Sequence, residues 1–171
     1  MEAVGVRGPL LGRLPDFLFR ADGSKFAYAG KAWLLVLLPS LALSLLAQAI
    51  GSVVFPGDPG PDIKANSLLL FAILVFVGPL LESIIMGGVL LVLVRWLRPA
   101  HAVFASAILW GAAHSLASPM WGLVVWWPFL VLSIVFLTWR GGGFWLGVGM
   151  ATLVHGLQNA TAGVALLASL E

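Results

Sequence analysis

The sequence predicts an all-α fold, a polytopic bundle of about five transmembrane helices with a cytoplasmic N-terminus. Two observations on composition support it: 61% of the 171 residues are hydrophobic and only 9% are charged, whereas about 25% are charged in a soluble domain. A third is that the apolar residues gather in stretches of membrane-spanning length. Together they exclude a water-soluble domain. They also exclude an intrinsically disordered chain, because disordered chains have far fewer apolar residues than this one.

The five apolar stretches each approach or exceed the roughly 20 residues that a helix needs to cross a bilayer core. The second is long enough to tilt or kink, and Pro79 is its expected kink point. The third is the shortest, so a count of four to six spans is consistent with the pattern. The stretches cover residues 32–55, 66–94, 102–117, 121–139 and 144–170. We predict a single transmembrane helical domain over residues 32–171, with its motif-bearing core at 75–165, preceded by a cytoplasmic or interfacial segment at 1–31.

The basic residues test the orientation independently. With five spans, eight of the nine fall on one side of the membrane, and only Lys64 falls on the other, beside Asp58 and Asp62. By the positive-inside rule, the side with the eight basic residues is cytoplasmic, and the N-terminus lies on this side. The eight are Arg7, Arg13, Arg20, Lys25, Lys31, Arg95, Arg98 and Arg140.

Residue types that are absent or scarce narrow the function. The chain has no cysteine, which excludes disulfides, thiolate zinc sites and a cysteine nucleophile. Sixteen charged residues with a net charge of +2 are too few for a nucleic-acid-binding surface. The partner that the composition does predict is the lipid bilayer. Nothing in the sequence predicts an oligomeric state.

Four polar side chains lie inside the predicted spans: Glu82, His114, His155 and Asn159. An ionisable group in hydrocarbon costs at least a few kcal/mol and commonly faces a functional cavity. Measured from the nearest cytoplasmic-side marker, Glu82, His114 and His155 are 13, 13 and 15 residues in, or roughly 20 Å at the rise of an α-helix. His155 and Asn159, four residues apart, share a helix face. We therefore expect one shared site, although a packing role for each residue alone stays open.

A carboxylate, two imidazoles and an amide suffice to hydrolyse a peptide bond without a covalent intermediate. The carboxylate and an imidazole activate water, and donors on the far side stabilise the oxyanion. Patterns for serine, aspartyl and His-Glu-x-x-His zinc hydrolases are missing from the spans. We therefore expect no cofactor. One metal alternative remains, in which Glu82, His114 and His155 bind zinc and leave a fourth position open.

Three segments in order resemble motifs of the CAAX prenyl protease and bacteriocin-processing family of intramembrane peptidases, also called the abortive-infection family. Its first motif, Pro-x-x-Glu-Glu-x-x-Phe-Arg-Gly, is similar to residues 79–88, PLLESIIMGG. The second, Phe-x-x-x-His, resembles residues 110–114, WGAAH. The third, His-x-x-x-Asn or Asp, is matched in full by residues 155–159, HGLQN.

The resemblance implies a catalytic role for each of the four polar residues. Glu82 and His114 would activate the water, and His155 with Asn159 would hold the oxyanion. The substrate would be a hydrophobic or lipidated peptide, and the protein would be a multi-pass component of a bacterial inner membrane. The chain departs from the first motif where Ser83 and Gly87 replace the second Glu and the Arg.

These departures leave alternative functions open. An inactive family member would act as a membrane scaffold or a bacteriocin-immunity protein. A small proton-coupled transporter is a further alternative, because an intramembrane Glu with two His also suits a proton relay.

Overall fold

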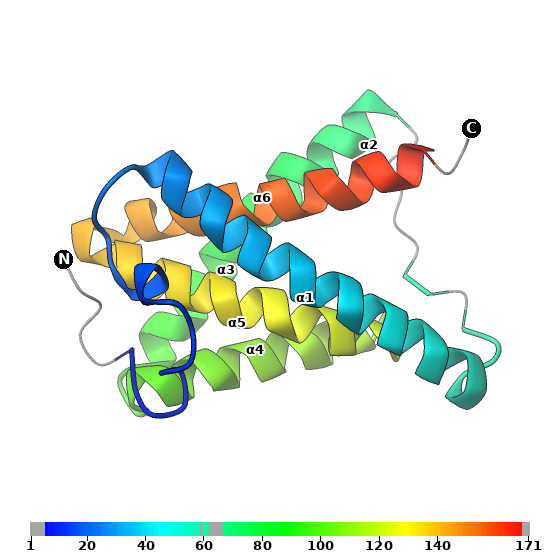
Figure 1. Cartoon of the computed structure of the whole chain (residues 1–171), viewed down its shortest axis with the longest axis horizontal. Coiled ribbons are helices and arrows are strands. Elements are labelled where there is room, and N and C mark those ends of the chain that lie inside the picture. Colours follow the sequence, from blue (N-terminus) through cyan, green and yellow to red (C-terminus); the bar gives the residue numbers. More distant parts are fainter. Residues whose placement is uncertain (1–5, 59, 62–66, 169–171) are drawn as a thin grey trace.

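The computed structural model describes residues 6–58, 60–61 and 67–168, and within these ranges it contains helices and no β-strand. The predicted all-α bundle is confirmed (Figure 1). The longer helices are α1 (Lys25–Val54), α3 (Gly78–Leu93), α4 (Pro99–Ser115), α5 (Trp121–Trp139) and α6 (Phe144–Ala168). The shorter ones are η1 (Asp16–Phe19), α2 (Leu68–Ala72), η2 (Ile73–Val77) and η3 (Arg140–Gly142).

Three helical segments are long and apolar enough to cross a membrane by length and composition: Lys25–Val54, Leu68–Leu93 and Trp121–Gly142. The second of these joins α2, η2 and α3 into one rod. α4 is shorter, with 17 residues, and α6 has 25 residues and carries the polar sequence from His155 to Asn159. The structure therefore has the long helices of a multi-pass membrane protein at the five predicted places. The cytoplasmic N-terminus stays a prediction.

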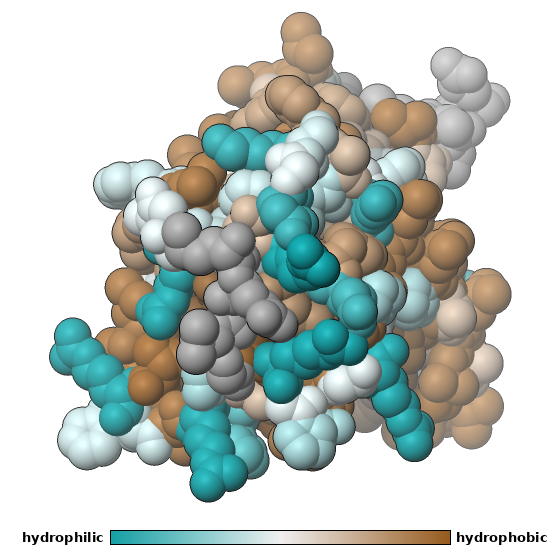
Figure 2. Space-filling model, turned by 60° about the vertical axis from the view of Figure 1, so that its left-hand side comes forward, coloured by the Kyte–Doolittle hydropathy of each residue, from teal (hydrophilic) through white to brown (hydrophobic). Residues whose placement is uncertain are grey.

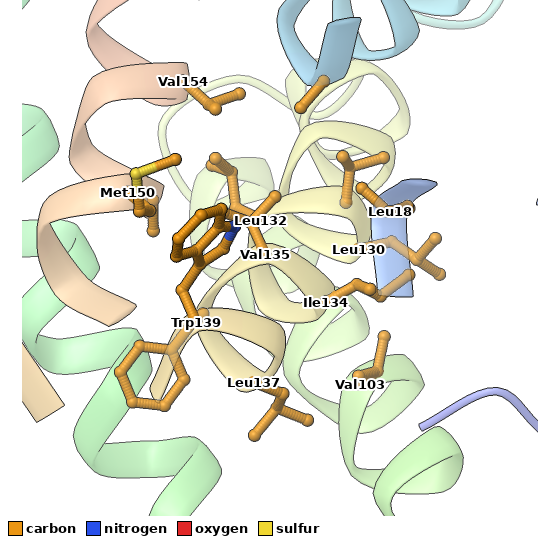
Figure 3. Packing of buried hydrophobic residues seen from close by; sticks show 14 of the residues in the cluster. Leu18, Val103, Leu130, Leu132, Ile134, Val135, Leu137, Trp139, Met150 and Val154 are labelled. Carbon is orange, nitrogen blue, oxygen red and sulfur yellow. The ribbon is translucent and has the colours of Figure 1, made fainter. Parts of the chain in front are cut away.

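Helix α5 forms the centre of the bundle. It packs against α1, α4 and α6, and every residue from Pro128 to Trp139 is buried. Figure 3 shows side chains from α5, α4, α6 and η1 meeting in this core. α4 and α5 lie close together at Gly122, where an added Cβ would collide with Ser115 Oγ and with the carbonyl oxygen of Gly111. Small residues thus bring these two helices together, as in many membrane bundles.

The segment before α1 packs onto one end of the bundle. The carbonyl oxygen of Leu18 accepts hydrogen bonds from the Tyr28 hydroxyl and the Thr138 hydroxyl, each at 2.9 Å. Val6 and Leu11 are also buried in the core cluster. The described part of the N-terminal segment is therefore folded against the helices. Because α1 begins at Lys25, the boundary predicted at residue 31 lies inside this helix.

The basic residues gather at the end of the molecule where α1 and α6 begin and α3 and α5 end (Figure 1). Figure 2 shows hydrophilic side chains over this end and hydrophobic ones around its flanks. Seven of the eight basic residues assigned to the cytoplasmic side are exposed, and Arg140 is partly buried. Lys64 and Asp62, predicted for the opposite side, lie outside the described residues.

The expected irregularity of the second span lies just before Pro79. Residues Ile73–Val77 form a π-helical turn, η2, between α2 and α3, and Pro79 occupies the first turn of α3. Such turns are rare and frequently occur at functional sites. This turn precedes Glu82 by about one helical turn of chain.

Candidate active site

Glu82 on α3 and His155 on α6 approach each other across the packed interface of these two helices. His155 Nε2 lies 3.6 Å from Glu82 Oε2, with the His155 side chain 8% exposed and the Glu82 side chain 31% exposed. The separation is too long for a hydrogen bond and close enough for electrostatic contact. A partly exposed carboxylate and a buried imidazole from different helices therefore face each other where α3 meets α6.

The ring of Phe129 on α5 lies between the two histidines. Its centroid is 5.4 Å from the His155 ring, in an edge-to-face arrangement, and 5.6 Å from the His114 ring, in a tilted one. His114 and His155 are therefore neighbours across one aromatic side chain. The structure gives no direct contact between His114 and Glu82.

His114 is held in a defined tautomer. Its Nδ1 lies 2.8 Å from the carbonyl oxygen of Trp110, and because a carbonyl only accepts, Nδ1 carries the proton. In the neutral ring Nε2 is then the acceptor. Trp121 packs edge-on against the imidazole at 4.8 Å. His114 Nε2 can thus accept a hydrogen bond from a water molecule, although the side chains packed around the ring are aromatic.

Asn159 lies one helical turn beyond His155 and contacts η2. Its Nδ2 donates a hydrogen bond to the carbonyl oxygen of Leu74 at 3.0 Å. Gly156, on the same side of α6, packs so closely that an added Cβ would lie 2.8 Å from the carbonyl oxygen of Val75. The face of α6 that carries Asn159 is therefore covered by η2 at this level.

The structure places three of the four predicted side chains around His155 and Phe129, and it turns the Asn159 amide toward η2. Glu82 meets His155, and His114 lies across Phe129 from His155. Asn159 shares the helix of His155 and reaches toward η2.

Comparison with known proteins identifies the family. The family model described as type II CAAX prenyl endopeptidase Rce1-like matches residues 64–161, more than half of the chain. The chain belongs to this Rce1-like family. The match contains Glu82, His114, His155 and Asn159, and it begins after α1. No curated protein and no solved structure matches the chain.

The family assignment confirms the resemblance drawn from the three motifs. It also establishes, at the level of the family, a CAAX-type intramembrane protease in an integral membrane protein. The catalytic role of each residue stays a prediction.

The two departures from the first Rce1-like motif lie in the core. An added Cβ at Gly87 would lie 2.7 Å from Phe136 Cε2 and 3.2 Å from Phe144 Cε2. The two rings therefore fill the space where a longer side chain would begin. Ser83 is buried, and its hydroxyl has no hydrogen-bond partner among the described residues. This Rce1-like protein thus has aromatic packing where the motif has an arginine.

The zinc alternative requires three ligands at one point. Within the described ranges, no group of three or more His, Asp or Glu side chains is close enough together to hold a metal ion. Glu82, His114 and His155 as placed therefore do not form such a set.

Phe129 and Trp121 are the neighbours of the site that sequence reasoning missed. Both belong to α5, whose sequence is apolar on every side. In such a helix no periodicity marks the residue that faces the site. The only available signal was the family aromatic at Trp110, whose ring stacks on Phe129 at 4.3 Å.

Proposed function

We propose that the chain is an intramembrane endopeptidase that hydrolyses a peptide bond with a water molecule activated by Glu82 and His114. The observation that carries this proposal is the placement of Glu82 3.6 Å from His155, with His114 beyond the shared Phe129 ring. The family assignment supports the reaction class.

The proposed reaction uses four groups and no metal. Glu82 takes a proton from water while the hydroxide oxygen bonds to the substrate carbonyl carbon, and His114 Nε2 orients the water. Nε2–H of His155 and an N–H of Asn159 stabilise the oxyanion. An amide nitrogen has two hydrogens, so Asn159 can hold Leu74 with one and the oxyanion with the other. When the C–N bond breaks, the proton on Glu82 passes to the leaving amine.

The substrate class follows from the surroundings of Glu82. On α3 its neighbours Leu81 and Ile85 are exposed, and in a bilayer these side chains face lipid. A hydrophobic or lipidated peptide is the substrate that would reach the carboxylate along this surface. We place the reaction in a bacterial inner membrane, in the half of the bilayer nearer the basic end.

The test compares substitutions of the site with matched ones elsewhere. Purified protein in lipid nanodiscs is incubated with hydrophobic and prenylated peptides, and the products are measured by mass spectrometry. Glu82→Gln and His114→Ala should reduce cleavage by about 10²-fold or more, the usual scale for a general base. The controls are Asp22→Asn and His101→Ala, both exposed. Equal rates in folded Glu82→Gln and parent protein would refute the proposal.

A non-catalytic role is the second candidate, and one observation favours it. The packing of Phe136 and Phe144 against Gly87 leaves no room for the arginine of the motif. A scaffold or immunity protein would keep the fold without the charge pair. Glu82-dependent turnover of any peptide would eliminate this candidate. A proton-coupled transporter would instead show Glu82-dependent proton flux in liposomes.

A further inference from the structure

The π-helical turn before Glu82 has a specific hydrogen-bonding defect. Its register is set by the Gly78 N–H, which donates to the carbonyl oxygen of Ile73, five residues back. The next bond in the same register would run from residue 79 to the carbonyl oxygen of Leu74. Residue 79 is proline and has no N–H to donate. The π register therefore leaves Leu74 without a helical donor.

The α register would leave a different carbonyl without a donor. Leu74 would accept from the Gly78 N–H, and the carbonyl oxygen of Val75 would lack a donor, because Pro79 is four residues further on. α6 meets Val75 at Gly156, which has no side chain to donate a hydrogen bond. It meets Leu74 at Asn159, whose amide does donate. A buried carbonyl without a partner destabilises a fold, and the donor that α6 supplies at Leu74 lowers this cost in the π register.

We infer that Asn159 supplies the donor that Pro79 lacks and thereby sets the rotation of α3 that places Glu82 beside His155. A change of register by one residue rotates the rest of a helix by about 100° relative to the part before it. Glu82 lies about one helical turn after the π turn, so its direction relative to α2 depends on which register forms. Asn159 is in this sense a positioning residue for Glu82, whatever contact it also makes with a substrate.

The geometric part of this inference does not require the chain to be an enzyme. Its consequence for hydrolysis rests on the proposed function: without the Asn159–Leu74 bond, Glu82 would no longer face His155. The experiment therefore reads out folding and geometry rather than peptide cleavage, so its failure is distinct from a failure of the proposed function.

The first experiment is a double-mutant cycle on the full chain in detergent micelles, followed by thermal unfolding. Asn159→Ala should lower the unfolding midpoint by several degrees. Pro79→Ala restores an N–H at residue 79, so the carbonyl oxygen of Leu74 has a backbone donor in either register. The donor is residue 79 in the π register and Gly78 in the α register. The loss caused by Asn159→Ala should therefore shrink to less than half in the Pro79→Ala background. Equal losses in both backgrounds, including failure to fold in both, overturn the inference.

The matched control removes a similar bond elsewhere. Trp127 Nε1 donates to the carbonyl oxygen of Leu35 at 3.0 Å, from α5 to α1. Trp127→Phe should lower the unfolding midpoint equally in the parent chain and in the Pro79→Ala background. A reduction of that loss by Pro79→Ala would show nonspecific stabilisation and would also overturn the inference.

The second experiment measures positioning. The chain has only three histidines, so labelling with ¹⁵N-histidine gives a readable ring spectrum, in which Glu82→Gln assigns the signal of His155. Asn159→Ala should shift this signal in the same direction as Glu82→Gln. Thr161→Ala, which removes a hydroxyl bonded within α6, should leave it in place. An unmoved His155 signal in folded Asn159→Ala protein overturns the positioning role.

Discussion

The ring of Trp110 lies flat on the ring of Phe129, with centroids 4.3 Å apart and planes inclined by 8°. Trp110 is also four residues before His114 and 5.8 Å from its ring. One aromatic side chain of α4 thus supports both the imidazole on its own helix and the phenyl ring that separates the two histidines. Through this stack, the aromatic residue that begins the second motif also contacts α5.

Phe129 should therefore matter for both stability and the site. It is buried, and replacing a buried phenylalanine with alanine costs about 3–5 kcal/mol. Phe129→Leu keeps most of the volume and should cost less than half of that. Peptide cleavage should fall in both variants, since the two imidazoles lose the ring between them. Chemical denaturation in micelles and peptide cleavage measure the two effects, and a fully active Phe129→Ala protein would contradict this view.

Two adjacent glycines of α3 provide a matched pair for the aromatic packing. Gly87→Ala places a Cβ 2.7 Å from Phe136 Cε2, and such overpacking costs about 1–3 kcal/mol. Gly88→Ala meets nothing within 4 Å and should stabilise the helix by up to about 1 kcal/mol. Unfolding midpoints of the two variants should move in opposite directions. A tolerated Gly87→Ala would show that Phe136 can move away.

The docking of the N-terminal segment depends on one carbonyl with two donors. Tyr28→Phe or Thr138→Val alone should each cost about 1 kcal/mol or less, because Leu18 keeps one hydrogen bond. The double variant leaves the carbonyl oxygen without either donor, so its cost should exceed the sum of the single costs. Trypsin cleavage after Arg13, which is exposed, should accelerate mainly in the double variant. Strictly additive behaviour would contradict the shared-acceptor geometry.

Chelators test the metal-free scheme. No three potential ligands converge within the described part of the chain, so peptide cleavage should be unchanged after dialysis against 1,10-phenanthroline or EDTA. Activity that is lost on dialysis and restored by added zinc would contradict the proposed mechanism. A water-soluble zinc peptidase treated in parallel checks that the chelator works.

The places of the helices could be predicted from the sequence because apolar runs of spanning length have few alternatives in a bilayer. The runs at 121–139 and 144–170 closely match α5 (Trp121–Trp139) and α6 (Phe144–Ala168). The spacing of His155 and Asn159 likewise placed both on one helix face. The sequence also carried three motifs that lie within the residues matched by the Rce1-like family model.

Only the tertiary structure decided how each helix is rotated and which partner each polar atom takes. Hydropathy marks the inward face of a helix when the other face meets water, but here lipid and protein core are both apolar. Phe129 is therefore indistinguishable in sequence from its neighbours on α5, and the structure alone puts it between two histidines. Likewise, the partner of Asn159 follows from a missing N–H at Pro79 and a π turn across the interface. Such a partner depends on the register of two packed helices, which no single stretch of sequence determines.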